Sequence, residues 1–145
     1  MKFPRMGSVR LGPKLAKPPT DLDDDSQERL YSFTRLTEGE LVPTRRLLWL
    51  AVVQAGKLDI GDRTSLKSTK QTFTLAPHTV VMTKQAAVGA PKVNWYIEQI
   101  NDGETIKPVR VTDVAQENDW WHLDGLHRLL AARILGLSVE AQIYR

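Results

Sequence analysis

The sequence of 145 residues contains no cysteine. Disulfides, zinc sites built on thiolates and cysteine nucleophiles all require that residue, so these kinds of site are excluded. The three histidines, His78, His122 and His127, do not form the His-Glu-x-x-His arrangement of zinc hydrolases. Because a cysteine-free chain is compatible with a reducing compartment, we expect a cytoplasmic protein.

Long apolar runs are also lacking. The longest is the seven-residue run Leu47–Val53, whereas a helix that spans a membrane needs about 18 or more apolar residues. Lys2 and Arg5 are not followed by an apolar stretch, so the N-terminus does not have the pattern of a secretory signal. The sequence therefore predicts no membrane partner.

Three common signatures of nucleotide binding or catalysis are missing as well. The chain has no Gly-x-x-x-x-Gly-Lys-Ser/Thr phosphate loop, no Gly-x-Gly-x-x-Gly fingerprint and no Gly-x-Ser-x-Gly elbow. What the chain does have is the composition of an ordinary globular domain, with 41% apolar and 26% charged residues. Its formal charge of +3 permits a polyanionic partner without requiring one.

Charge is unevenly distributed over residues 1–37. Residues 1–20 contain basic residues and prolines but no acid, and residues 21–28 are strongly acidic. Such a segment has few apolar groups to offset the entropy lost on ordering, so we expect an arm that stays extended or docks on the body of the protein. The functional alternatives are a basic arm that binds phosphate and an acidic site that binds a metal ion. The basic residues are Lys2, Arg5, Arg10, Lys14 and Lys17, and the acids are Asp21, Asp23, Asp24, Asp25 and Glu28.

Residues 38–76 are expected to form a helical elaboration. A broad apolar face, a proline suited to a first helical turn and Gly56 as a stop predict a helix over 38–57. The remainder is rich in Lys, Thr and Ser and predicts a loop with one short strand. Trp49 is expected in the core because an indole buries much apolar area, with base stacking as the alternative. Residues 1–76 together are the candidate surface for a protein partner.

The second half, residues 77–145, has clearer periods. Short β-branched runs predict strands, and apolar residues at helical spacing followed by glycine predict two helices. The resulting order is β-α-β-β-α-β, so we expect an α+β fold with a small mixed β-sheet and packed helices. Trp120 and Trp121 should face opposite sides of a strand, and the outward ring could stack on a base. The predicted strands are 78–83, 106–112, 120–123 and 139–144, and the predicted helices are 93–101 and 126–135.

The most informative segment is the strand-to-helix turn at residues 124–128, Asp-Gly-Leu-His-Arg. Free backbone N–H groups and the positive end of the helix dipole lie at such a turn. Arg128 offers a planar fork to phosphate oxygens, His127 offers one or two N–H donors, and Gly125 permits close approach of the backbone. The turn therefore predicts an anion site with a cationic pair. Asp124 as a simple N-cap and Gly125 as a simple turn glycine are the structural alternatives.

The run Asp-Gly-Leu-His-Arg-Leu-Leu-Ala-Ala-Arg-Ile-Leu-Gly over 124–136 resembles the Gly-x-His-Arg helix of the ParB/sulfiredoxin superfamily, in particular its ParB-like nuclease-domain branch. The segment 96–111, with a helix, a glycine, a proline and a strand, is similar to that family as well. The resemblance covers residues 77–145 and implies a ParB/sulfiredoxin-like fold. It also implies binding of a nucleotide through its phosphates, CTP as in partition proteins or ATP or ADP as in sulfiredoxins. The implied phosphate-binding residues are Asp124, Gly125, His127, Arg128 and Lys107.

The resemblance implies a role in DNA-linked processes such as plasmid or phage maintenance, nuclease action or regulation, with nucleotide or DNA as the partner. Sulfiredoxin chemistry is not implied, because Leu126 stands where those enzymes carry a catalytic cysteine. His127 and Arg128 are the candidate catalytic residues, since preorganised cations neutralise charge that develops on a phosphoryl group. Mg²⁺ is a candidate cofactor, held by Asp124 or Glu98 together with phosphate oxygens. The carboxylates that could hold a metal or orient a nucleophile are Glu98, Asp102, Glu104 and Asp124.

Two other functions are compatible with the same residues. One is a non-enzymatic regulator or protein-interaction module that retains the fold, and the other is a small-molecule kinase that uses ATP or ADP. Arg133 lies beyond the first turn of its predicted helix. We expect it at the surface or paired with a carboxylate, outside any of these functions.

Overall fold

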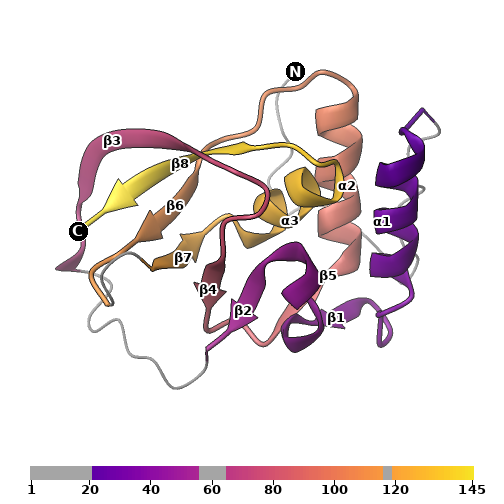
Figure 1. Ribbon diagram of the computed structural model, residues 1–145, viewed down its shortest axis with the longest axis horizontal. Coiled ribbons are helices and arrows are strands. Elements are labelled where there is room, and N and C mark those ends of the chain that lie inside the picture. The colour runs from indigo at the N-terminus through magenta and orange to yellow at the C-terminus, as the bar shows by residue number, and fades with distance from the viewer. Residues whose placement is uncertain (1–20, 56–64, 116–118) are drawn as a thin grey trace.

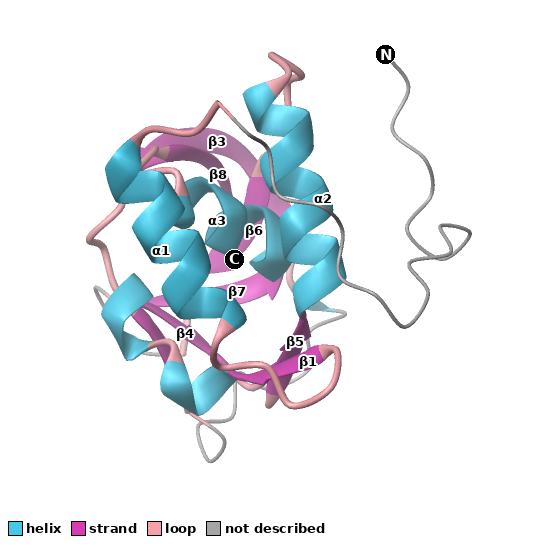
Figure 2. Cartoon of the chain, turned by 90° about the vertical axis from the view of Figure 1, so that its right-hand side faces the viewer, coloured by secondary structure: helices cyan, strands magenta, loops and turns pink. Residues whose placement is uncertain are grey.

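The computed structural model describes residues 21–55, 65–115 and 119–145, so the predicted basic arm at 1–20 lies outside the described residues. The fold is a mixed α+β arrangement with helices gathered on one side of a six-stranded sheet (Figures 1 and 2). The helices are α1 (Asp24–Thr34), α2 (Ala90–Asn101) and α3 (Leu126–Ile134), with short 3-10 helices η2 (Thr44–Arg46) and η3 (Leu48–Leu50). The strands are β1 (Leu41–Pro43), β2 (Val52–Gln54), β3 (Ser68–Leu75), β4 (Val81–Thr83), β5 (Ala87–Gly89), β6 (Val109–Thr112), β7 (Trp120–Asp124) and β8 (Val139–Tyr144).

The six-stranded sheet has the order β2-β4-β7-β6-β8-β3 and mixes parallel and antiparallel pairs. Strand β4 runs parallel to β2 and β7, and β6 runs parallel to β8 but antiparallel to β7. As predicted, Trp120 and Trp121 lie on opposite faces: Trp121 is fully buried, whereas Trp120 packs on Phe73 with ring centroids 4.7 Å apart. Because β7 and β3 are not neighbours in the sheet, this contact indicates a strongly curved sheet.

The helix predicted over 38–57 is wrong. That segment forms β1, η2, η3 and β2 instead. Pro43 has ψ 126°, which is extended, and Ala51 lies in the left-handed region with φ +58°, so neither residue continues an α-helix. Part of the apolar face that suggested a helix is buried all the same, whereas Leu41 and Leu48 are exposed. The buried residues are Val42, Leu47, Leu50 and Val52.

The described part of residues 38–76 does not form the predicted helical elaboration. They supply β2 and β3, which are the two edge strands of the six-stranded sheet. The predicted loop after residue 57 contains the eight-residue strand β3, which pairs antiparallel with β8, while residues 56–64 lie outside the described residues. Trp49 is 45% exposed on η3, so its expected place in the core is wrong.

The extended arm expected for residues 1–37 is wrong where α1 forms. Asp23 starts this helix, because its Oδ1 accepts a hydrogen bond from the Ser26 N–H at 2.7 Å. Leu30 and Phe33, three residues apart, are buried on one face of the helix. The acidic stretch therefore belongs to a capped helix start, where negative charge is favourable.

The elements predicted for the second half are confirmed in kind and order. Strand β8 and the start of α3 lie where the sequence predicted them, and β7 extends one residue further, to Asp124. Helix α2 begins three residues earlier than predicted, since Pro91 occupies its first turn. Strands β4 and β6 start later than predicted, and β5, taken as part of a break, pairs antiparallel with β1.

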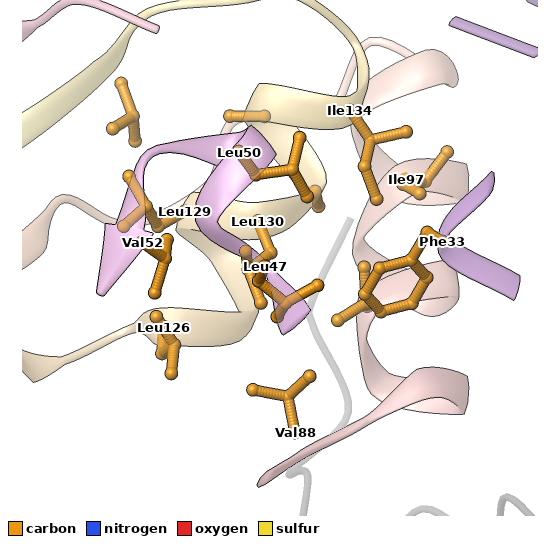
Figure 3. Packing of buried hydrophobic residues seen from close by; sticks show 14 of the residues in the cluster. Phe33, Leu47, Leu50, Val52, Val88, Ile97, Leu126, Leu129, Leu130 and Ile134 are labelled. Carbon is orange, nitrogen blue, oxygen red and sulfur yellow. The ribbon is translucent and has the colours of Figure 1, made fainter. Parts of the chain in front are cut away.

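Helix α3 lies at the centre of the core, with α1 and α2 on either side of it in Figure 2. Figure 3 shows Leu126, Leu129, Leu130 and Ile134 of α3 among Phe33 of α1, Leu47 and Leu50 of the 3-10 segment, Val88 of β5 and Ile97 of α2. Burial on all sides fixes the position of α3, and thereby of the turn that precedes it.

None of the helices formed by the described residues could span a bilayer.

Candidate anion site at the starts of two helices

The turn between β7 and α3 is made by Gly125, which is the N-cap of α3 and has φ +95°. No side chain of the described residues caps this helix start. The alternative of Asp124 as N-cap is therefore wrong: Asp124 ends β7, and its Oδ2 accepts a hydrogen bond from an Arg128 terminal nitrogen at 3.3 Å. The first N–H groups of α3 thus keep their capacity to bind an anion.

Gly125 is favoured here by its backbone angle, and it also leaves space for the side chain of Arg128. A Cβ atom at this position would lie 2.5 Å from a terminal nitrogen of Arg128. The guanidinium of Arg128 therefore folds back over the Cα atom of Gly125, and Arg128 is only 8% exposed. The glycine makes room for the arginine, in addition to any approach of a ligand to the backbone.

His127 joins the start of α3 to the start of α2. Its Nε2 accepts a hydrogen bond at 3.1 Å from the N–H of Gly89, the N-cap of α2, so Nδ1 is the nitrogen left to carry a proton. Burial lowers the pKa of His127 to about 4, with further lowering by Lys92 and His122. The imidazole is therefore neutral at pH 7, and the expectation of a cationic His127–Arg128 pair is wrong.

The second cation of the site is Lys92, in the first turn of α2, which the sequence analysis missed. The Gly89-Ala90-Pro91 sequence could have indicated this helix start, because proline favours the first turn. Tyr96 follows Lys92 on the same face of α2, and burial raises the pKa of its hydroxyl. A cavity of about 200 Å³ lies between the starts of α2 and α3, lined by Lys92, Tyr96, Asp124, Gly125, His127 and Arg128.

Of the predicted phosphate-binding residues, the structure brings together all but one. Lys107 is exposed in the segment before β6 and does not line the cavity. Among the four candidate carboxylates, Asp124 is the one that lines it; burial and the neighbouring Asp102 raise the pKa of Glu98. Within the described residues, no three His, Asp or Glu side chains are grouped as a metal site. Magnesium held here would need phosphate oxygens as its other ligands.

No protein-family model, curated protein or solved structure matches this chain. The resemblance to the ParB/sulfiredoxin superfamily therefore rests on the segments 96–111 and 124–136.

Gly125→Ala is expected to destabilise the protein more than alanine at another glycine with positive φ. Gly103, with φ +85° and no atom near its missing Cβ, is the matched control. For Gly103→Ala we expect a loss of about 1–2 kcal/mol from backbone strain alone. Gly125→Ala should lose about 1 kcal/mol more, because the buried arginine must move and give up its hydrogen bond. Urea denaturation measures both, and equal losses would contradict the close packing of Arg128 on Gly125.

Proposed function

We propose that this protein binds the phosphate group of a nucleotide or nucleic acid in the cavity between α2 and α3. The observation that carries the proposal is the convergence of Arg128, Lys92 and the start of α3, which no side chain of the described residues caps, on one cavity. The start of a helix favours anions, and the first N–H groups of α3 supply hydrogen bonds. The first N–H groups of α2 are used within the protein, by His127 Nε2 and the Glu40 carbonyl. Arg128 adds a planar fork, and Lys92 adds a flexible point charge.

The dimensions of the cavity favour a phosphate group over a whole nucleotide. Pockets that enclose drug-sized molecules measure about 300–1,000 Å³, and this cavity measures about 200 Å³. We therefore propose that one or two phosphate groups enter the cavity. The sugar and base, or the rest of a nucleic-acid strand, would lie outside it.

We further propose that the domain is ParB-like, with a ParB/sulfiredoxin-like fold and CTP or ATP as its nucleotide. The support is the motif over 124–136 together with its position, since it follows β7 and opens α3. A role in DNA-linked processes follows from the same resemblance. If phosphoryl transfer or hydrolysis takes place, Arg128 and Lys92 would neutralise the developing charge. Neutral His127 would act by holding the two helix starts together and by donating from Nδ1.

A regulator or protein-interaction module is the second candidate, and a separate surface favours it. Leu48 and Trp49, adjacent residues of η3, are 66% and 45% exposed. Large exposed apolar side chains of this kind are typical of contact surfaces when they occur together. Under this proposal the protein binds a partner through residues 1–76 without turnover.

The proposal is tested by thermal unfolding with CTP, ATP, ADP, GTP, pyrophosphate and a short DNA duplex, with and without Mg²⁺. A ligand at 100 times its dissociation constant should stabilise the protein by about 2.7 kcal/mol. Lys92→Ala should weaken binding about tenfold or more, as expected for loss of a charged hydrogen-bond donor. Lys107→Ala, outside the cavity, is the matched control and should bind as the wild type does.

The absence of any shift with all six ligands would contradict the phosphate site and favour the interaction module. Turnover of a bound nucleotide without an acceptor would indicate a hydrolase. Turnover only in the presence of an acceptor would indicate a small-molecule kinase.

A further inference from the structure

We propose that the Asp124 carboxylate competes with a phosphate for Arg128, so that the phosphate must displace the carboxylate from Arg128 in order to bind. This inference rests on the proposed phosphate-binding function and deepens it. The affinity of the cavity for an anion would then depend on how well that anion competes with a carboxylate for Arg128.

The two side chains of this ion pair differ in their exposure to solvent. The side chain of Arg128 is 10% exposed, whereas that of Asp124 is 60% exposed. Arg128 is held in the space left by the missing Cβ of Gly125. The carboxylate can therefore move into solvent at little cost, while the arginine is kept in the cavity.

The contact between Arg128 and Asp124 is also long and single. It consists of one hydrogen bond, at 3.3 Å, between an Arg128 terminal nitrogen and the Asp124 Oδ2. Charge-assisted hydrogen bonds of this kind are usually about 2.7–2.9 Å long, and strong arginine–carboxylate pairs are bidentate. By comparison, Arg145 holds Asp113 through two hydrogen bonds of 3.0 Å each. The Arg128–Asp124 contact is thus the weaker of the two and suited to exchange.

The Asp124 carboxylate also does not cap the helix that follows it. At α1, Asp23 is the N-cap and accepts a hydrogen bond from a backbone N–H of the first turn. At α3 the N-cap is Gly125, and Asp124, one residue earlier, contacts Arg128, so no side chain in the described parts of the chain caps α3. Among the described residues, Asp124 is the carboxylate that lines the cavity. A phosphate in the cavity could bind both the arginine and the N–H groups of the helix start, whereas the Asp124 carboxylate binds the arginine and does not cap the helix.

The test is calorimetric titration with pyrophosphate in a buffer that contains a chelator, so that no metal ion contributes. Asp124→Asn keeps a hydrogen-bond acceptor for Arg128 but removes the negative charge. It should bind pyrophosphate about three- to tenfold more tightly than the wild type, the range expected for removing a competing charge. Asp113→Asn is the matched control, because it changes the net charge equally at an ion pair outside the cavity. It should change the affinity by less than about twofold, since exposed charges at a distance are screened.

Weaker binding by Asp124→Asn, or an effect equal to that of Asp113→Asn, would overturn this inference while leaving the phosphate site in place. Failure of the wild type and both variants to bind pyrophosphate would overturn the proposed function as well. Asp124→Ala removes both the charge and the acceptor, and it should also bind more tightly than the wild type. It provides the same comparison if the asparagine variant does not fold.

Discussion

Arg133→Met is expected to lower the free energy of unfolding by about 3–5 kcal/mol, the range found when one side of a buried charged network is removed. Arg133 is 3% exposed on α3, where the sequence analysis expected a surface residue or a partner for a carboxylate, and that expectation is wrong. Its guanidinium donates to four backbone carbonyls from two other segments. The acceptors are Leu50 at 2.9 Å, Ala51 at 3.0 Å, Ala76 at 3.4 Å and Thr79 at 2.6 Å.

The large effect follows from what the methionine would leave behind. Buried carbonyls without a donor each cost about 1–3 kcal/mol. The Ala51 and Ala76 carbonyls would keep a backbone donor each, the N–H groups of Val81 at 3.0 Å and Thr79 at 3.1 Å, so the loss falls mainly on the carbonyls of Leu50 and Thr79. Burial lowers the pKa of Arg133 to about 10, which still leaves it charged at pH 7, so the carbonyl dipoles stabilise a real positive charge. Since a domain of this size is stable by about 5–15 kcal/mol, the variant should be close to unfolding.

Urea denaturation followed by tryptophan fluorescence measures this loss. Arg45→Met makes the same replacement at an exposed arginine of η2 and should change stability by no more than about 0.5 kcal/mol. Arg133→Lys keeps the charge but loses the planar fork, and it should lie between the two. A stability of Arg133→Met equal to that of Arg45→Met would contradict the role of Arg133 as a bridge between the segments.

Acidification is expected to remove about 3 kcal/mol of stability through His127 alone. The pKa of this imidazole is about 4 in the folded protein, against an ordinary value of 6.5. Between these two values the unfolded chain binds more protons than the folded protein. The contribution of His127 to stability is therefore complete above pH 6.5, falls as the pH is lowered toward 4, and does not change further below that.

His127→Gln isolates this effect from the other titrating groups. The glutamine carbonyl can still accept the hydrogen bond from the Gly89 N–H, but it does not titrate in this range. The difference in unfolding free energy between wild type and variant should change by about 3 kcal/mol between pH 7 and pH 4. A difference that is independent of pH would show that His127 is not held as the neutral form.

The candidate site could be found from the sequence because it lies within one local motif. A strand, a glycine and a helix with cationic residues in its first turn are recognised by spacing alone, and β7, Gly125 and α3 follow that pattern. What the spacing did not show is the contribution of Lys92, which comes from a different helix. Lys107 was predicted from the resemblance. It is exposed two residues before β6 begins and does not line the cavity.

The first half of the chain was poorly predicted for a related reason. The apolar residues between Leu41 and Val52 were recognised as core, and most of them are buried. Their spacing predicts a helix, but the segment ends in β2, which pairs with β4 at the edge of the six-stranded sheet. Local propensity does not include the hydrogen bonds that a distant strand offers, and here those bonds decided the backbone conformation.

The α+β class, the order of elements after residue 77 and the position of the turn at Gly125 can be predicted from the sequence. These follow from backbone periods and from the demands of glycine and proline, which act over a few residues. The neutral form of His127, the burial of Arg128 and Arg133, and the pairing of Asp124 with Arg128 depend on contacts between segments. The partners in these contacts include Gly89 and Leu50, which are 38 and 83 residues away along the chain, and desolvation depends on everything packed around a group.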